Sequence, residues 1–373
     1  MSSSFTSIPI LDLALAENPE TRPQLLQQLG HILTDIGFLY VKNHGVPSST
    51  IDNLITSLPP LFDLPAHAKE EVALEKSPHF LGYSKLGSER TAHQQDLREQ
   101  FEFATELPDE FNREKGDPWF ARLRGPNQWP SAAGASFRGI VERYTAELRR
   151  LSEFFLNLIA EALGLEEEFF FQFVSDQDRL KLVHYHDPSS PLSSNTGNDG
   201  GGSDSSLKQG VGPHKDSSGW LTFLLQASPP EVKGLQVLNK DGNWIDVPAI
   251  PGTFVVNIGQ AFEAVTNGMC RATIHRVMLP SSPDQGGYHR YSVPYFQGVR
   301  STLTKSEVRG MWDLYFKDAG KEELEEAARI DSPFLRGKYE MWGEAQLRTK
   351  IRSHRDVGKR YYPEIYEACI SDD

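Results

Sequence analysis

The chain has 373 residues, of which 38% are hydrophobic and 24% charged, a balance typical of a globular protein with a sizeable core. Its formal net charge of −13 disfavours nucleic acid and anionic membranes as partners, so an anionic ligand would need a local cationic anchor. The two cysteines show no pairing pattern, and the first residues resemble no secretory signal. We therefore expect a cytoplasmic protein without membrane-spanning segments, compatible with a monomer.

The N-terminal region, residues 1–130, is predicted to combine short strands with two helices. Apolar residues recur at helical spacing over 25–36, and Gly37 follows as a suitable end of that helix. A second helix is expected over 48–61. The stretch 76–130 is predicted to be irregular because turn residues interrupt it throughout. It contains one aromatic-rich run, Gln100-Phe101-Glu102-Phe103.

The rest of the chain is predicted to place a β core between helical segments. Residues 131–177 contain a long amphipathic helix and a connection. Over 178–300, short β runs separated by Gly and Pro indicate a closed or double-sheet β architecture. Within it, residues 188–209 are rich in Ser, Gly, Asn and Asp, as is typical of a flexible insertion. Residues 301–373 are predicted to be helical. We expect a mainly β core with α flanks, folding as one cooperative unit.

Two His-x-Asp motifs are candidates for metal binding. His214-Lys215-Asp216 precedes a predicted strand, and at a strand edge its first and third side chains share one face and can reach one ion. His354-Arg355-Asp356 is expected on a basic helix, where the same two positions diverge by roughly 200°. We therefore interpret the second motif as part of a solvated helix and the first as the metal candidate.

A third ligand is needed, and His275 is its candidate. His275 lies at the start of a predicted strand, two hairpins after Asp216. Two His and one carboxylate leave open positions on iron(II) for O₂ and a bidentate keto acid. A competing cluster is His184-Tyr185-His186, which with a further His and Glu could form a cupin-type site. No Glu follows it at short spacing, but the alternative stays open.

The candidate anion anchor is Arg290-Tyr291-Ser292. Because its first and third residues share one face of a predicted strand, a guanidinium and a hydroxyl point the same way. Arginine suits a carboxylate because its planar fork donates two charge-assisted hydrogen bonds, to which serine can add another. The pattern is common in isolation, and its position soon after His275 makes it informative.

These motifs, in this order and spacing, resemble the isopenicillin-N-synthase-like family of 2-oxoglutarate- and iron(II)-dependent dioxygenases. The similarity extends over most of the chain and includes the segments 8–12, 37–46, 234–237, 251–259 and 291–296. The resemblance implies a double-stranded β-helix, which is a jelly roll with helices packed on its outside.

The resemblance also implies the cofactors and the residues that hold them. Iron(II) would be bound by His214, Asp216 and His275, which would be the catalytic centre. The cosubstrate 2-oxoglutarate would be bound by Arg290, Ser292 and Tyr185. O₂ would be the second cosubstrate, and ascorbate an optional aid to activity.

The implied reaction is the oxidation of a small organic metabolite, by hydroxylation, desaturation or ring closure, with succinate and CO₂ as coproducts. A role in specialised metabolism would fit. Aromatic residues are the candidates for the substrate pocket: Tyr83, Phe103, Trp220, Phe296 and Trp342, together with Phe101 and Phe334. Two alternatives stay open. Arg-x-Ser also occurs in relatives that use no 2-oxoglutarate, and a non-catalytic jelly-roll binding protein could retain the same residues.

Overall fold

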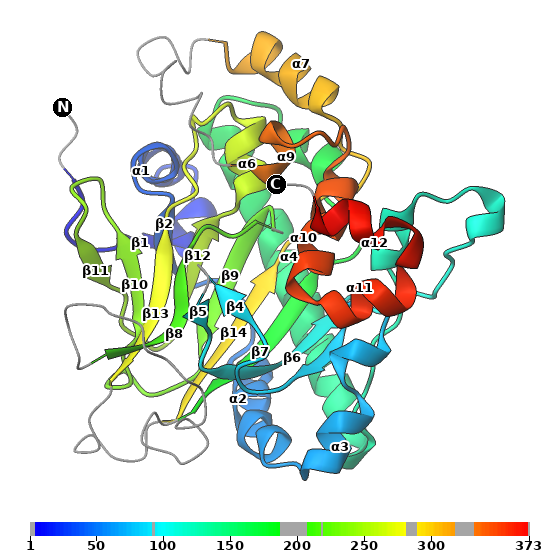
Figure 1. Ribbon diagram of the computed structural model, residues 1–373. Coiled ribbons are helices and arrows are strands. Elements are labelled where there is room, and N and C mark those ends of the chain that lie inside the picture. The colour runs from blue at the N-terminus through cyan, green and yellow to red at the C-terminus, as the bar shows by residue number, and fades with distance from the viewer. Residues whose placement is uncertain are drawn as a thin grey trace.

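Two β-sheets pack against each other at the centre of the molecule (Figure 1). The structure is a computed structural model that describes residues 4–91, 94–186, 207–217, 219–280, 289–317 and 332–371. Within these residues the larger sheet has the strand order β1 (Ile10–Asp12), β2 (Phe38–Lys42), β12 (Thr253–Ile258), β9 (Leu221–Gln226), β14 (Arg290–Phe296), β7 (Arg179–Tyr185), β6 (Arg98–Ala104) and β3 (Gly82–Ser84). The smaller sheet has the order β11 (Trp244–Asp246), β10 (Leu235–Leu238), β13 (His275–Pro280) and β8 (Leu207–His214). A short ribbon pairs β4 (Arg90–Thr91) with β5 (Gln94–Gln95).

The two sheets form the double-stranded β-helix that the resemblance implied. β1 pairs with β2 in parallel, and the other pairings within the two sheets are antiparallel. Because successive side chains of a strand point to opposite faces, each strand of the larger sheet serves two environments. In β7, Leu180 and Leu182 pack with the helices, whereas Val183 and Tyr185 face the smaller sheet. The face between the sheets is therefore available for a site.

Helices cover the outer face of the larger sheet (Figure 1). The buried apolar residues of α1 (Arg22–Asp35), α2 (Ser48–Phe62) and α4 (Ala135–Ala162) share one core with this sheet. The helices predicted over 25–36 and 48–61 and the long amphipathic helix are thereby confirmed. The remaining helices are α3 (Ala66–Glu71), α6 (Gln260–Val265), α7 (Lys305–Tyr315), α9 (Pro333–Arg336), α10 (Trp342–Ser353), α11 (Arg355–Tyr361) and α12 (Pro363–Ile370). No helix in the described ranges is long and apolar enough to cross a membrane.

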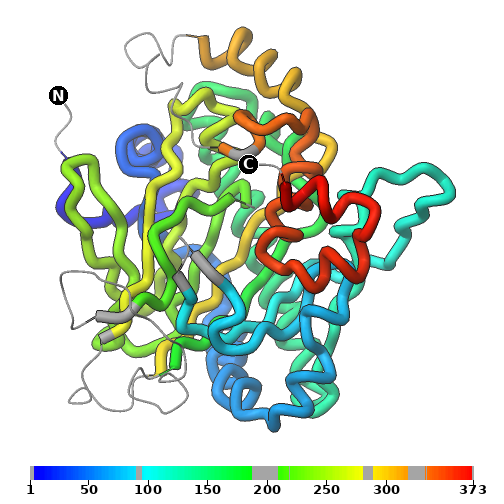
Figure 2. Tube along the Cα trace, in the orientation of Figure 1, coloured from blue at the N-terminus to red at the C-terminus, as the bar shows by residue number. Residues whose placement is uncertain are grey.

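The C-terminal helices α10–α12 lie beside a segment from the N-terminal third of the chain (Figure 2). The Tyr362 hydroxyl donates to the carbonyl of Pro78 at 2.6 Å, and the Tyr361 hydroxyl donates to the carbonyl of Lys76 at 2.9 Å. Phe80 stacks on Tyr362 with ring centroids 5.7 Å apart. These contacts join the end of α11 to the segment 76–80, and Lys350 of α10 reaches β6, where it donates to Glu102 Oε1 at 2.8 Å.

Three details differ from the sequence-based predictions. The run Gln100–Phe103 is not irregular, because it belongs to β6, which pairs along its length with β7. His354 does not lie on a solvated helix: it is largely buried between α10 and α11, with Nε2 3.7 Å from Glu89 Oε1. Of the predicted insertion 188–209, the last residues belong to β8, and residues up to 206 lie outside the described ranges.

Candidate metal centre and its cavity

Three side chains meet between the two sheets with their ligand atoms facing one another. His214 ends β8 and His275 begins β13, and the register of these strands places the two histidines directly opposite each other. Asp216 follows two residues after His214, as the spacing required. Asp216 Oδ1 lies 3.7 Å from Nε2 of His214 and 3.7 Å from Nε2 of His275. The three ligand atoms all lie within 4.8 Å of one another, which is compatible with one shared ion.

Neighbouring groups fix the orientation of all three ligands. His214 Nδ1 lies 2.8 Å from the carbonyl of Gly212, and His275 Nδ1 lies 3.1 Å from that of Thr273. A hydrogen on each Nδ1 satisfies these carbonyls and leaves each Nε2 lone pair for a metal. Asp216 Oδ2 accepts hydrogen bonds from the hydroxyl of Thr222 at 2.7 Å and the amide of Asn257 at 2.8 Å. Asp216 Oδ1 therefore remains free for the ion, so the donor set fits iron(II).

The electrostatics of the three residues also suit a metal. Burial, helped by the neighbouring His275, lowers the pKa of His214 to about 4, so its imidazole is neutral near pH 7. Burial alone would raise the pKa of Asp216, but His275, His214 and the hydrogen bonds to Oδ2 hold that pKa below its ordinary value. Neutral imidazole and ionised carboxylate are the forms that bind a metal.

A buried guanidinium lies on the larger sheet, in the wall of the same cavity. Arg290 is 2% exposed, and its Nη2 donates to Gln226 Oε1 at 3.2 Å. Its Nη1 is buried and has no hydrogen-bond partner among the described residues. Ser292 and Tyr185 line the cavity with it, and the guanidinium lies over the Tyr185 ring, 4.9 Å from its centroid. Burying an unpaired cation costs several kcal/mol, so an anion is needed here.

Gly234 lies between the Arg290 side chain and the backbone of β13. Gly234 has a φ of 153°, a conformation that side-chain-bearing residues rarely adopt. A Cβ at this position would lie 2.9 Å from the carbonyl oxygen of Met278 and 3.4 Å from Cδ and Nε of Arg290. The φ of Gly234 and the close Met278 carbonyl therefore require glycine at this position, next to Arg290.

The cavity that joins these groups has a volume of about 380 Å³. Its wall near Arg290 and the metal ligands is largely apolar, and comprises Phe38, Val183, Val211, Leu224, Leu235 and Val277. Elsewhere the wall carries charged side chains, including Glu102, Lys181 and Lys350. The sequence-based predictions did not include these three residues. Lys181 could have been inferred, because it lies at the i−4 position from Tyr185 on one strand and so shares its face.

The aromatic pocket candidates are distributed unevenly. Phe296 lines the cavity. Trp342 lines a smaller adjacent pocket of about 80 Å³. Tyr83 donates its hydroxyl to Glu99 at 2.6 Å, and the remaining candidates are core residues that do not line the cavity: Phe101, Phe103, Trp220 and Phe334. Trp220, for example, stacks on Phe173 with centroids 5.6 Å apart.

The competing cluster at His184 and His186 includes a carboxylate, Glu99, that the sequence-based predictions missed. Glu99 Oε1 lies 3.0 Å from His184 Nδ1 and 2.8 Å from His186 Nε2. Lys69 donates to Glu99 Oε2 at 2.9 Å. Glu99 comes from β6, far away in the sequence, so no short spacing could reveal it.

A double-stranded β-helix that presents two imidazole nitrogens and one carboxylate oxygen in an accessible cavity is the arrangement of a non-haem iron oxygenase. The second buried feature of the cavity, the Arg290 guanidinium, matches a cosubstrate with a free carboxylate. The fold and site thus define the class, and comparison with known proteins narrows it to a family.

Residues 8–132 match the family model described as the N-terminal region of non-haem dioxygenases in morphine synthesis, and residues 178–299 match the 2OG-Fe(II) oxygenase superfamily. The 2-oxoglutarate-dependent dioxygenase frbJ of Dothideomycetidae sp. is 41% identical, covering 97% of this chain and 94% of its own length. A 2-oxoglutarate-dependent dioxygenase of Gibberella zeae is 33% identical, covering 98% and 94%. A crystal structure of a 2OG-Fe(II) oxygenase family protein from Caulobacter crescentus has a TM-score of 0.68 at 24% identity, covering 93% and 99%.

The chain belongs to the 2OG-Fe(II) oxygenase superfamily. It is an iron(II)- and 2-oxoglutarate-dependent dioxygenase that acts on a small molecule, and iron(II) and 2-oxoglutarate are its cofactor and cosubstrate.

Proposed function

We propose that His214, Asp216 and His275 hold the iron of this dioxygenase and that Arg290, Ser292 and Tyr185 bind the distal carboxylate of 2-oxoglutarate. The observation that carries the first assignment is the convergence of two Nε2 atoms and Asp216 Oδ1 within 4.8 Å, with no hydrogen bond among them. The second assignment is supported by the buried, unpartnered Nη1 of Arg290.

Bound iron, with 2-oxoglutarate and O₂, supplies the oxidising power: the keto acid becomes succinate and CO₂ while a substrate C–H bond is oxidised. The chain's own residues hold the participants in place. Thr222 and Asn257 fix the rotation of the Asp216 carboxylate, and the Gly212 and Thr273 carbonyls fix the histidine tautomers. Apolar residues around Arg290 and the ligands exclude water, which strengthens the electrostatic interactions within the site.

The substrate is proposed to be a small organic metabolite, oxidised by hydroxylation, desaturation or ring closure. The cavity supports this, because a volume of about 380 Å³ is within the range of small-molecule sites. Both cysteines are free and buried, which supports a cytoplasmic location with reducing conditions.

The test is an anaerobic titration of the iron-loaded protein with 2-oxoglutarate. We expect a weak visible charge-transfer band in the wild type, and succinate once air is admitted. Arg290→Lys keeps the positive charge but loses the planar fork, so the KM for 2-oxoglutarate is expected to rise about 10- to 100-fold while iron binding stays intact. Absence of the band in the wild type, or an unchanged KM in the variant, would contradict the respective assignment.

A further inference from the structure

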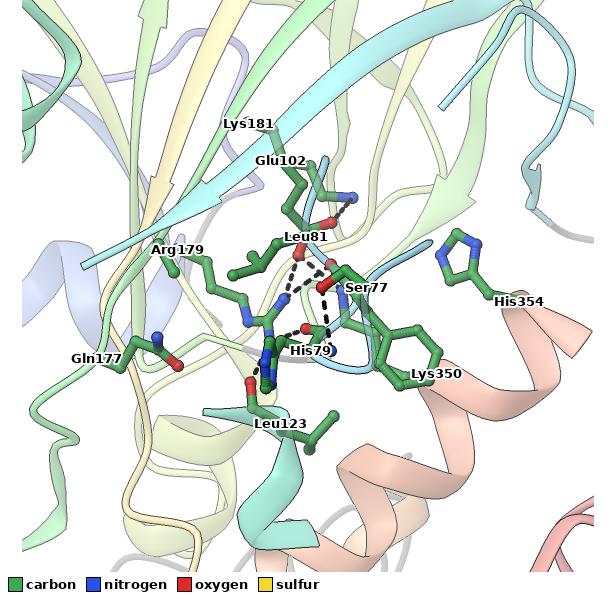
Figure 3. Close-up of polar contacts among 12 residues, drawn as sticks. Ser77, His79, Leu81, Glu102, Leu123, Gln177, Arg179, Lys181, Lys350 and His354 are labelled. Carbon is green, nitrogen blue, oxygen red and sulfur yellow. Dashed lines mark hydrogen bonds and ion pairs between the residues drawn. The ribbon is translucent and has the colours of Figure 1, made fainter. Parts of the chain in front are cut away.

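The cavity has a strongly cationic wall that neither the metal nor 2-oxoglutarate requires. Arg179, Lys181 and Lys350 line it beyond the apolar surface near Arg290, together with one carboxylate, Glu102, and Arg98 lines it opposite Tyr185. Figure 3 shows Arg179, Lys181 and Lys350 around Glu102. Four long cations in one cavity wall need an explanation, because the desolvation of each costs free energy.

Strand geometry places Arg179 and Lys181 at the end of the site that lies away from Arg290. Arg179, Lys181, Val183 and Tyr185 alternate along β7 and all line the cavity, so Tyr185 lies at the 2-oxoglutarate end and the two cations follow toward the other end. Glu102 of β6 pairs directly with Lys181.

The iron ligands lie at the level of these cations. Thr222, which donates to Asp216, is opposite Phe296 of β14, and Phe296 is opposite Arg179 of β7. β14 therefore lies between β9, which carries Thr222, and β7, which carries Lys181. Two strand spacings, roughly 10 Å, separate β9 from β7. That span has room for a compact molecule.

Lys350 reaches the same place from α10. Gln346, one helical turn earlier and so on the same face, donates to the carbonyl of Ser217 at 2.6 Å. Ser217 is the residue after the iron ligand Asp216. The helix that carries Lys350 is thus anchored directly beside the metal centre, and Lys350 lies next to the space that a substrate would occupy.

The charges of this wall do not balance. Arg98 is paired with Glu89 at 2.7 Å and with Asp96 at 3.2 Å. Arg179 and Lys350 donate to Glu102 Oε1 at 2.7 and 2.8 Å. Four cations thus face three carboxylates, which leaves one positive charge. His354 also faces the cluster, and burial lowers its pKa to about 4, so it is neutral near pH 7.

The excess charge is concentrated on the two lysines. Arg179 also donates to the carbonyls of His79, Phe80 and Leu123, so its donors are occupied. Lys181 Nζ lies 3.7 Å from Glu102 Oε2 and makes no hydrogen bond within the described ranges. Lys350 has one hydrogen-bond acceptor among the described residues for its three N–H groups. Both ammonium groups can therefore donate into the cavity.

We propose that Lys181 and Lys350 bind a carboxylate of the substrate, and that this dioxygenase therefore acts on a small monocarboxylic acid. The inference rests on the proposed function, since it takes the metal centre as the place of oxidation. One carboxylate matches the single excess charge, whereas a phosphate dianion would exceed it. Glu102 holds the two ammonium groups in position. Its negative charge repels an anion that does not enter between the two lysines.

The test measures binding to the protein loaded with iron(II) and 2-oxoglutarate under anaerobic conditions, so that Arg290 is already occupied. The probes are benzoate, phenylacetate and hexanoate, their primary amides, phenyl phosphate and benzylamine, each titrated calorimetrically. We expect at least one carboxylate to bind, with its amide about tenfold weaker or more. Lys181→Met and Lys350→Met are each expected to weaken carboxylate binding about 10- to 100-fold, because each removes a charge-assisted hydrogen bond.

Two controls separate a binding role from a structural one. Lys350→Arg keeps the charge and should retain carboxylate binding within a fewfold, and Lys359→Met removes an exposed lysine of α11 and should change nothing. Lys181→Met is the more robust variant, because Lys181 makes no hydrogen bond that folding depends on.

Several outcomes would overturn the proposal. These are equal binding of acids and amides, tighter binding of phenyl phosphate or benzylamine, failure of every carboxylate to bind, or unchanged affinity in both methionine variants. Failure of the proposed function is recognised separately, because the 2-oxoglutarate charge-transfer band of the wild type would then be missing before any probe is added.

Discussion

Two clusters in this molecule each bring two histidines and one carboxylate within 4.8 Å, yet they differ in what their ligand atoms contact. In the cluster of His214, Asp216 and His275, hydrogen bonds engage the atoms that point away from the centre. In the cluster of Glu99, His184 and His186, the hydrogen bonds join the candidate ligand atoms to one another.

The carboxylates of the two clusters also differ in the charge of the groups that donate to them. The acceptor oxygen of Asp216 is oriented by neutral donors, Thr222 and Asn257. Glu99 receives a hydrogen bond from the ammonium of Lys69 at 2.9 Å, which would repel a metal cation nearby. A metal centre is therefore recognised by lone pairs that remain available after the surrounding hydrogen bonds have formed, and proximity of the right residue types is insufficient.

The largest expected difference concerns iron itself. His214→Ala removes a ligand, so iron content is expected to fall from one ion per chain to background and succinate formation to stop. His186→Ala removes the corresponding group of the other cluster and should leave iron content unchanged. Metal analysis after anaerobic loading checks both. A loss of iron in the His186 variant, with its fold retained, would assign a metal to the second cluster.

The next difference concerns stability. Glu99→Gln leaves the Lys69 ammonium largely buried without its counter-charge, and breaking a buried pair in this way costs about 3 to 5 kcal/mol. We expect the free energy of unfolding in urea to fall by that order, while iron binding is preserved. A loss below about 1 kcal/mol would indicate that the cluster is solvated in solution.

A smaller effect is expected behind the metal centre. Asn257→Ala removes one of the two hydrogen bonds that orient Asp216 and touches no proposed ligand atom. Removal of such a supporting group typically weakens metal affinity about 10- to 100-fold. Competition with a calibrated chelator measures the change. Asn157→Ala, which removes an asparagine of α4 that donates to Glu167 on the helical side of the larger sheet, serves as the control and should leave iron affinity unchanged.

The smallest effect is a difference in acid sensitivity. Burial would raise the pKa of Glu99, but hydrogen bonds to His184, His186 and Tyr83 outweigh it and hold the pKa well below its ordinary value. The stability that Glu99 contributes is therefore complete above the unfolded-state pKa near 4.3 and is lost as pH falls below it. Between pH 4.5 and 3 the wild type should lose up to about 1.4 kcal/mol per pH unit more than Glu99→Gln. Parallel stability curves for the two proteins would contradict this.

The same comparison explains what the sequence could reveal. Asp216 and Ser292 lie two residues from His214 and Arg290, and strand geometry alone brings such neighbours to one face, so both pairs were predictable. Glu99 meets His184 only because β6 pairs with β7, a contact between distant segments that no local spacing encodes. β6 itself escaped prediction because its charged residues are buried by partners from other elements, which hides the alternation of a strand.

The aromatic candidates show a different limit. Phe296 lines the cavity, whereas Trp220 and Phe103 are buried in the core, although all three belong to a strand or directly precede one. Residue type and periodicity tell which face of a strand is apolar, but both faces of the larger sheet are covered, one by helices and one by the smaller sheet. Only the strand pairing decides which aromatic meets the cavity.

The attachment of α10 beside the metal centre bears on which part of the chain determines substrate selectivity. The proposed iron and 2-oxoglutarate residues all lie within 178–299, but Lys350 lies beyond both segments that match family models. If Lys350 binds the substrate as proposed, grafting the α10–α12 segment of this chain onto a relative would transfer its preference for carboxylates, and selectivity would be a modular property of this enzyme.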